Sequence, residues 1–264
     1  SIQTWLTKQL ALFDQGRVQF IKQNRPAAAA GITFFVTQVH EDAPLLEKRS
    51  VLYEFQLDSY ADLLTLDLKG LLAGEPIYNQ HRRSDPLYLV CSNGRRDRCC
   101  SRLGLALYRA LDATVGDAAW QTTHLGGHRY APTMVTFPDG ICYGRLAESD
   151  LVALVQAQEA GEVYPSRLRG RCCHQGVVQA AESFLRQETG QRAVDAYRLL
   201  EAKSVAERNW TVRFAGPARG DIHQVNLVQT IFEPDPLVSC SPHKTKPVAH
   251  FQLVSIAGDS DAQA

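Results

Sequence analysis

Hydrophobic periodicity is most regular in the middle of the chain, where short apolar runs alternate with segments of helical spacing. Residues 87–91 (LYLVC) are wholly apolar, which is typical of a strand buried on both faces. Pro138-Asp139-Gly140 separates two further apolar runs and predicts a hairpin turn, and Gly161 is suited to end a helix. In chain order the expected elements are a strand at 87–91, a helix at 101–111, a strand at 120–123, strands at 133–137 and 141–146, and a helix at 148–160. This order predicts an α/β domain of thioredoxin-like outline.

The N-terminal third is expected to add an α/β region of its own. Residues 1–30 have helical spacing with a soft break at 24–26. Two β-branched and aromatic runs, at 31–39 and 50–57, predict strands. Residues 59–73 then predict a single helix, with Ser59 as its N-cap.

The C-terminal third is expected to contain one helix followed by antiparallel strands. A helix is predicted at 177–188, where Gly190 ends it. The expected strands are 210–215, 223–232 and 249–256. These patterns divide the chain into an N-terminal region at 1–84, a central domain at 85–168 and a C-terminal region at 169–264, the alternative being one interlocked unit.

Charge and composition exclude several classes of protein. The 264 residues hold 28 Lys and Arg against 28 Asp and Glu, which argues against a polybasic nucleic-acid binder. No apolar run approaches the roughly 18 residues of a membrane span, and the N-terminus lacks the apolar core and cleavage site of a signal peptide. We therefore expect a cytoplasmic protein with no nucleic-acid or membrane partner.

The seven cysteines are clustered, and their number is odd. Cys91, Cys99 and Cys100 lie together, and Cys172 and Cys173 are adjacent, whereas Cys142 and Cys240 stand alone. Seven cysteines are too few for a disulfide scaffold in a chain of this length. In a reducing compartment such clustering indicates metal or redox chemistry.

The strongest candidate site combines cysteines and histidines at one end of the predicted sheet. Cys91 ends the apolar strand, and either Cys99 or Cys100 follows after the next loop. His124 and His128 come next, with two glycines in the tight loop between them. Two thiolates and two imidazoles suit either tetrahedral zinc or an iron–sulfur cluster with mixed ligands. The C-x₂₋₄-C spacing usual for structural zinc is absent.

The charge on such a cluster has a predictable consequence. A 2Fe–2S core of charge 2+ with two thiolates and two neutral imidazoles is neutral when oxidised and carries one negative charge when reduced. Four thiolates would make it two units more negative in each state, so histidine ligands are expected to raise the reduction potential. The second ring nitrogen of a ligating histidine can lose its proton, which makes the potential depend on pH.

Three sequence motifs resemble those of the sucrase/ferredoxin-like family. They are Cys91-Ser-Asn-Gly-Arg-Arg-Asp-Arg-Cys-Cys100, His124-Leu-Gly-Gly-His128-Arg-Tyr-Ala-Pro-Thr and Tyr143-Gly144-Arg145. The resemblance is tight over residues 86–146 and looser through Arg169-Gly170-Arg171 and the helix that follows, and the first eighty residues match poorly.

The resemblance implies an α/β fold in which a thioredoxin-like ferredoxin domain carries additional N-terminal and C-terminal elements. It also implies a 2Fe–2S cluster held by Cys91, Cys100, His124 and His128. Aligning Arg96-Asp97 with the Arg-Asp pair of the family selects Cys100 over Cys99.

From these residues and this resemblance we expect proton-coupled one-electron transfer, by a carrier or by a reductase of a ferric chelate. No G-x-G-x-x-G follows a strand, so a separate reductase is expected to donate the electrons. The main alternative is a zinc-binding structural or interaction module with the same ligands, and a thiol oxidoreductase comes third. No paired acidic motif supports glycoside hydrolysis, because Glu148 and Asp150 begin a helix, where acids are common.

The remaining polar clusters have plainer interpretations beside their functional ones. Five arginines lie in or beside the predicted ligand loops: Arg95, Arg96, Arg98, Arg102 and Arg129. The plain interpretation is a solvated basic rim. In the functional interpretation, their charges stabilise a reduced cluster and dock an acidic partner or an anionic substrate. Asp97 is a candidate for orienting a histidine. Cys172-Cys173-His174 is interpreted as two small buried residues beside a loop histidine, with a second metal site as the alternative, and Cys142 and Cys240 as core residues.

Overall fold

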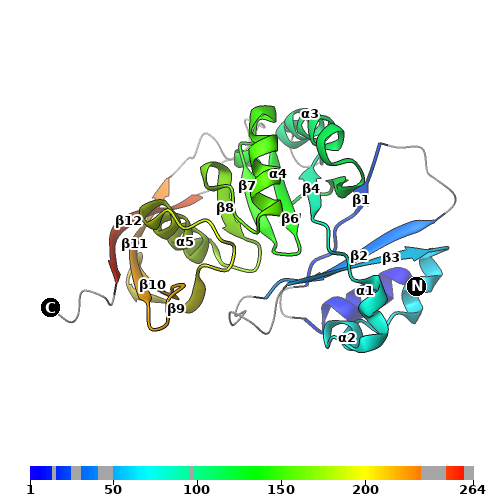
Figure 1. Cartoon of the computed structure of the whole chain (residues 1–264), viewed down its shortest axis with the longest axis horizontal. Helices are drawn as coiled ribbons and strands as arrows, with labels where there is room; N and C mark the ends of the chain where they lie inside the picture. The colour runs from blue at the N-terminus through cyan, green and yellow to red at the C-terminus, as the bar shows by residue number, and fades with distance from the viewer. Residues whose placement is uncertain (14–15, 25–30, 41–49, 95–97, 233–247, 259–264) are drawn as a thin grey trace.

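The computed structural model is an α/β protein built on three β-sheets (Figure 1). It describes residues 1–13, 16–24, 31–40, 50–94, 98–232 and 248–258. None of the helices in these ranges is long and apolar enough to span a membrane.

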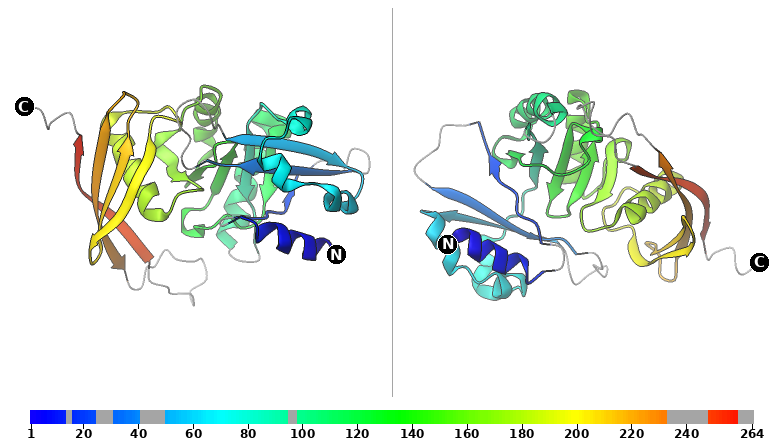
Figure 2. Two further views of the ribbon diagram at one scale, coloured as in Figure 1. Left: turned by 90° about the horizontal axis from the view of Figure 1, so that it is seen from below. Right: turned by 180° about the vertical axis from the view of Figure 1, so that it is seen from behind.

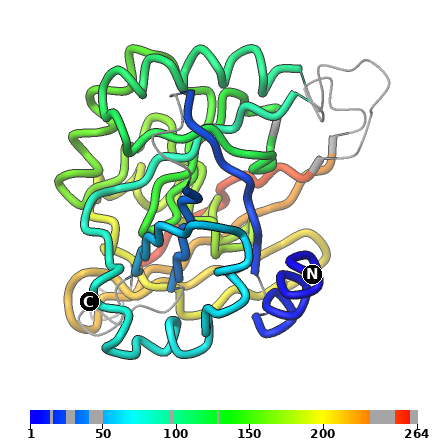
Figure 3. Tube along the Cα trace, turned by 90° about the vertical axis from the view of Figure 1, so that its right-hand side faces the viewer, coloured from blue at the N-terminus to red at the C-terminus, as the bar shows by residue number. Residues whose placement is uncertain are grey.

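A mixed six-stranded sheet forms the centre of the molecule, in the order β1-β5-β4-β6-β7-β8. Its strands are β1 (Ile21–Lys22), β4 (Leu87–Cys91), β5 (Ala119–Thr122), β6 (Thr133–Phe137), β7 (Ile141–Gly144) and β8 (Leu168–Arg171). Strands β4 and β5 are parallel, and the other neighbouring pairs are antiparallel. Strand β1 pairs with β5 at one edge of the sheet. Figure 3 shows the long dark-blue segment that contains β1.

Both faces of the central sheet are covered, which explains the unbroken apolar sequence of β4. Tyr88 and Val90 pack under α3 (Arg98–Val115) and α4 (Leu151–Glu159). Leu87 and Leu89, which alternate with them, pack against the hairpin on the opposite face. The predicted strand-helix-strand-strand-strand-helix order and the α/β fold class are therefore confirmed.

The N-terminal hairpin consists of β2 (Ile32–Gln38) and β3 (Val51–Leu57) and packs between two layers. One side of it contacts the central sheet through Phe35 and Leu52. Its other side, around Tyr53 and Phe55, packs on α2 (Leu68–Leu72). Helix α1 (Ile2–Leu10) lies on this side of the molecule as well (Figure 2).

The C-terminal unit is a four-stranded antiparallel sheet in the order β12-β11-β10-β9, with one helix, α5 (Gly176–Thr189), on it. The strands are β9 (Arg198–Ala206), β10 (Asn209–Ala215), β11 (Ile222–Phe232) and β12 (Val248–Gly258). The helix ends at Gly190, which has a φ of 70° as predicted for a C-terminal glycine. Short 3₁₀ turns complete the fold: η1 (Tyr60–Thr65), η2 (Pro76–His81), η3 (Gly116–Ala118), η4 (His128–Tyr130), η5 (Glu148–Asp150) and η6 (Pro165–Arg167).

Two helix predictions for the N-terminal region were wrong. Helix α1 ends at Leu10. Residues 21–22 form strand β1, because their backbone groups hydrogen-bond to β5 and not within a helical turn. The helix expected at 59–73 is split into η1 and α2, since Asp67 caps a new helix by accepting a hydrogen bond from the Lys69 backbone N–H. Ser59 does cap η1, as predicted.

Strands β8 and β9 were not predicted. Only β8 bears on the domain division, because it adds the start of the C-terminal third to the central sheet, as β1 adds part of the N-terminal third. The boundaries at 84/85 and 168/169 remain a prediction.

Candidate metal centre

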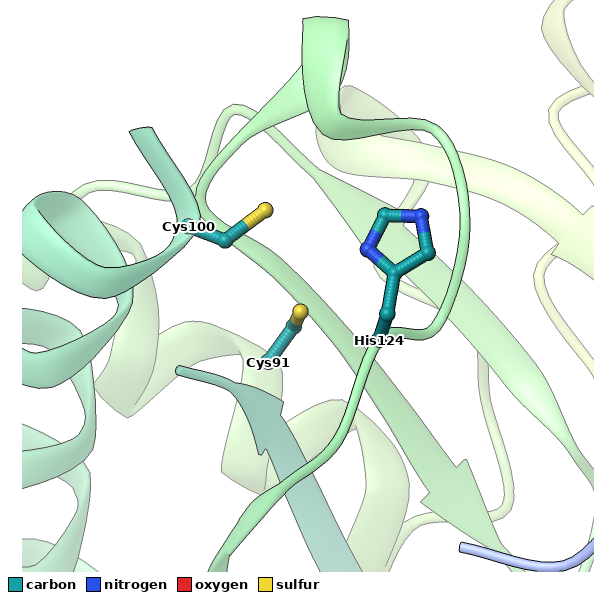
Figure 4. A group of neighbouring side chains, drawn as sticks. All are labelled: Cys91, Cys100 and His124. Carbon is teal, nitrogen blue, oxygen red and sulfur yellow. The ribbon is translucent and has the colours of Figure 1, made fainter. Parts of the chain in front are cut away.

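Three potential metal ligands converge at the carboxyl end of the two parallel strands. Cys91 is the last residue of β4, Cys100 lies in the first turn of α3, and His124 follows β5. The pairing of Cys91 with Thr122 brings the two strand ends side by side. Figure 4 shows both sulfur atoms and the imidazole facing one another, and their ligand atoms all lie within 4.8 Å. Two thiols and an imidazole at this spacing can bind one metal centre.

The three side chains differ in burial. Cys91 and Cys100 are 0% and 1% exposed, whereas His124 is half-buried. The site therefore has a buried sulfur side and a histidine side closer to solvent. That asymmetry matters for any chemistry in which a proton must enter or leave.

The surroundings of Cys91 favour the thiolate, which is the form that binds metals. A hydrogen bond from Cys100 is the largest influence and lowers the pKa of Cys91 to about 5, against the opposing effect of burial. The backbone N–H groups of Asn93 and Leu125 also donate to this sulfur, and His124 adds a smaller electrostatic contribution. These contacts favour the thiolate form of Cys91 over the thiol.

Gly104 allows α3 to approach β4, and the sequence interpretation missed it. A Cβ at this buried position would overlap the backbone carbonyl oxygen of Cys91. The helix that carries Cys100 can therefore lie directly against the strand end that carries Cys91. A glycine in the middle of an apolar helix face is the sequence signal that marks such an approach.

Replacing Gly104 with alanine is expected to move α3 away from β4 and reduce the metal bound per chain. The clash costs about 1–3 kcal/mol of unfolding free energy, which outweighs the helix propensity gained. Metal content and the urea unfolding midpoint measure both effects. Gly176→Ala is the matched control, because the nearest atom to a Cβ there is 3.8 Å away. Full metal content in Gly104→Ala would contradict this role.

The loop between the two predicted histidine ligands depends on its glycines. Gly126 and Gly127 have φ angles of 95° and 66°, which other residues rarely adopt. A Cβ on Gly127 would also lie 2.5 Å from the Arg169 guanidinium. His128 begins η4, and its side chain lies outside the described residues. Its role as a ligand remains a prediction.

The two adjacent cysteines take different places. Cys100 is a thiol that faces Cys91 and His124, while Cys99 is disulfide-bonded and does not belong to this group. The structure thus agrees with Cys100 as the partner of Cys91, although ligation itself remains a prediction.

The arginines of the predicted basic rim are only partly described. Arg98 and Arg102 are exposed on α3, and Arg129 is half-buried against the ring of Tyr130. Arg95, Arg96 and Asp97 lie outside the described residues. Arg169 was not assigned to this rim by the sequence interpretation, yet its guanidinium lies directly against the ligand loop at Gly127.

The interpretation of Cys172-Cys173-His174 was wrong about burial. Cys172 is exposed and Cys173 half-buried, and both lie in the turn that follows β8. His174 is the buried member, and its Nδ1 lies 3.4 Å from Glu182 Oε2. The groups of potential ligands found in the described part of the chain do not include this segment. Cys142 is half-buried in β7, and Cys240 lies outside the described residues.

The comparison with known families covers most of the N-terminal two thirds of the chain. A profile of the family described as sucrase/ferredoxin-like matches residues 8–170. The match includes most of the first eighty residues, which the motifs had matched poorly, as well as residues 86–146, where the resemblance is tight. The chain is also similar to "Altered inheritance of mitochondria protein 32" of Meyerozyma guilliermondii, with 32% identity over 98 residues. This alignment covers 33% of the present chain and 35% of that relative. No solved structure matches.

Proposed function

This chain belongs to the sucrase/ferredoxin-like family, and from that premise we propose that it binds a 2Fe–2S cluster and transfers one electron at a time. The observation that carries the proposal is the convergence of Cys91, Cys100 and His124 from three separate elements onto one point. In this proposal His128, at the other end of the same loop, completes the set of two thiolates and two imidazoles.

The asymmetric burial of the ligands suits this cofactor. When bound, a 2Fe–2S cluster accepts and returns a single electron. The buried Cys91 and Cys100 thiolates would hold its inner iron, and the histidine loop would hold the outer one nearer solvent. An imidazole at the solvent side can release or accept a proton at its second ring nitrogen, which couples protonation to the electron.

Two cations near the ligand loop support uptake of negative charge. Arg169 lies against Gly127, and Arg129 directly follows His128. Positive charges beside the ligand loop lower the free-energy cost of adding an electron to a bound cluster. They also favour docking of an acidic electron-transfer protein or of an anionic ferric chelate, which we propose as acceptors, with a separate reductase as donor.

An absorption spectrum of protein purified without oxygen, with iron, sulfide and zinc assayed on the same sample, tests the cofactor. Broad absorption between roughly 300 and 600 nm that bleaches with dithionite, with about two irons and two sulfides per chain, is the expected result. The same donors are also good zinc ligands. A colourless protein with about one zinc per chain would overturn the redox proposal and favour a structural or interaction module.

Replacing His124 with cysteine is expected to retain a cluster but change its redox behaviour. A thiolate adds negative charge and removes a ring nitrogen that can titrate. The reduction potential should fall by something on the order of hundreds of millivolts, and its pH dependence should weaken. Potentiometric titration between pH 6 and 10 measures both.

His128→Cys is the companion variant, and each single change leaves the other histidine in place. If the slope of potential against pH is unchanged in both variants, the histidines do not couple the proton to the electron.

A further inference from the structure

Three guanidinium groups surround one aromatic ring beside the ligand loop. Arg129 and Arg169 each lie 4.7 Å from the ring centroid of Tyr130, and Arg145 lies 5.3 Å from it. A single ring face compensates only a small part of the repulsion among three cations. This cluster is therefore a concentration of positive charge held in place by the fold.

Within the described residues, neither Arg129 nor Arg169 has a carboxylate partner. Other arginines of this chain do: Arg167 binds Asp150 at 2.9 Å, and Arg186 binds Glu182 at 2.9 Å. Burial lowers the pKa of the Arg169 guanidinium, as expected of a cation that has lost water without gaining an anion. Two half-buried arginines that have no carboxylate partner in the described part of the chain, where other arginines are paired, indicate a binding site.

These two arginines line a groove of about 910 Å³ between the central sheet and the C-terminal unit. The rest of its wall is largely apolar and aromatic, contributed in part by Phe184, Trp210 and Phe251. The N-terminus of α5 also borders it at Gly176, and no side chain caps that helix. The volume lies within the range of small-molecule sites, roughly 300–1,000 Å³.

We propose that this groove binds a small organic anion, with its carboxylate or phosphate on Arg129 and Arg169 and a flat apolar body against the aromatic side chains. Guanidinium groups recognise both kinds of head group through paired hydrogen bonds, and aromatic walls favour a planar body. The backbone N–H groups at the start of α5 add favourable partial charge. The same two arginines are part of the proposed docking of an anionic acceptor, but the groove site does not rest on that function, because binding there requires no electron transfer.

The position of the site gives it a connection to the metal centre. The Arg169 guanidinium contacts the position of Gly127, which lies between His124 and His128. A bound anion would therefore place its head group beside the histidine side of the candidate metal centre.

Isothermal titration calorimetry with matched probes tests the proposal on the purified chain. The probes are 2-naphthoate, its neutral isostere 2-naphthamide, 2-naphthyl phosphate and inorganic phosphate. We expect the two naphthyl anions to bind at least about tenfold more tightly than the amide, with affinity falling as salt is raised. The stronger naphthyl anion identifies the head group as carboxylate or phosphate, and weak binding of inorganic phosphate shows that the apolar body contributes. Equal affinity for naphthoate and naphthamide, a comparison that needs no variant, would overturn the proposal.

Single arginine substitutions locate the site. Arg169→Gln and Arg129→Gln should each weaken binding of the preferred naphthyl anion by about tenfold or more. Arg145→Gln is the matched control, since it removes the same charge beside the same ring but Arg145 does not line the groove. Its effect should stay below about threefold. Equal effects of all three substitutions would show a general charge effect and contradict a built site.

Discussion

Replacing Cys100 with serine is expected to remove the metal almost completely. Cys100 is 1% exposed, and its sulfur lies among the ligand atoms of Cys91 and His124. Serine is nearly isosteric, but its hydroxyl is a much weaker ligand for iron or zinc than a thiolate. Iron, sulfide and zinc per chain, assayed with the anaerobic spectrum, measure the loss.

Cys99→Ser is the control for this result, because it changes the adjacent residue of the same helix turn. Cys99 is disulfide-bonded and lies outside the ligand group, so its loss should leave the metal content near that of the unmodified chain. Greater metal loss in Cys99→Ser than in Cys100→Ser would show that the neighbouring cysteine is the ligand.

The candidate site was largely predictable because its chemistry depends on residue type and local position. Cys91 ends a strand that the apolar run marked, and Cys100 and His124 follow at the ends of neighbouring elements. Parallel neighbouring strands bring such ends to one edge of a sheet. The sequence therefore indicated which residues meet, although it left Cys99 and Cys100 as alternatives.

The supporting residues were not predictable in the same way. Gly104 contacts the Cys91 carbonyl, which is 13 positions away in the sequence. Arg169 contacts Gly127, which is 42 positions away. Such contacts depend on how far a helix or strand edge approaches another, which no periodicity encodes. The sequence shows Gly104 on a helix face and Arg169 beside a glycine, but it does not show which residues they contact.

Fold prediction succeeded where both faces of an element are buried and failed for strands that are exposed or very short. Strand β4 was found because packing on both sides leaves only apolar residues in it. The hairpin of β6 and β7 was found because a turn at Pro138-Asp139-Gly140 separates two mainly apolar runs. Strand β9 was missed because seven of its nine residues are exposed, so its sequence carries no alternation. Strand β1 has only two residues, and its pairing with β5 defines it.

A buried ionic cluster joins the central sheet to the C-terminal unit. Glu182 of α5 accepts two hydrogen bonds from Arg186, at 2.9 and 3.1 Å. Its second oxygen lies 3.7 Å from Arg171 of β8 and 3.4 Å from His174. The Arg186 guanidinium also donates to carbonyls of the loop after α5, at Ala193 and Val194. One carboxylate therefore holds together a strand edge, a turn and a helix.

Replacing Glu182 with glutamine is expected to lower the free energy of unfolding by about 3–5 kcal/mol. The amide is similar in size, but it leaves Arg171 and Arg186 buried without a negative charge. Glu162→Gln is the matched control, because Glu162 pairs with Arg192 at 3.1 Å on the surface, where side chains are 37% and 48% exposed. That change should cost less than about 1 kcal/mol. Urea unfolding at pH 7 measures both, and equal costs would contradict a special role for Glu182.

The pH dependence of the same variant separates the charge from the shape of the side chain. Burial alone would raise the pKa of Glu182, but the contact with His174 and the charges of Arg171 and Arg186 outweigh it and hold the pKa at about 2, below its ordinary 4.5. A carboxyl with a depressed pKa stabilises the fold fully above its unfolded value and loses that effect as pH falls through its folded value. The contribution, about 3 kcal/mol, is therefore present above pH 4.5 and lost between 4.5 and about 2. The stability difference between the unmodified chain and Glu182→Gln should shrink over this interval, whereas a difference that stays constant with pH would mean that packing, and not charge, explains the loss.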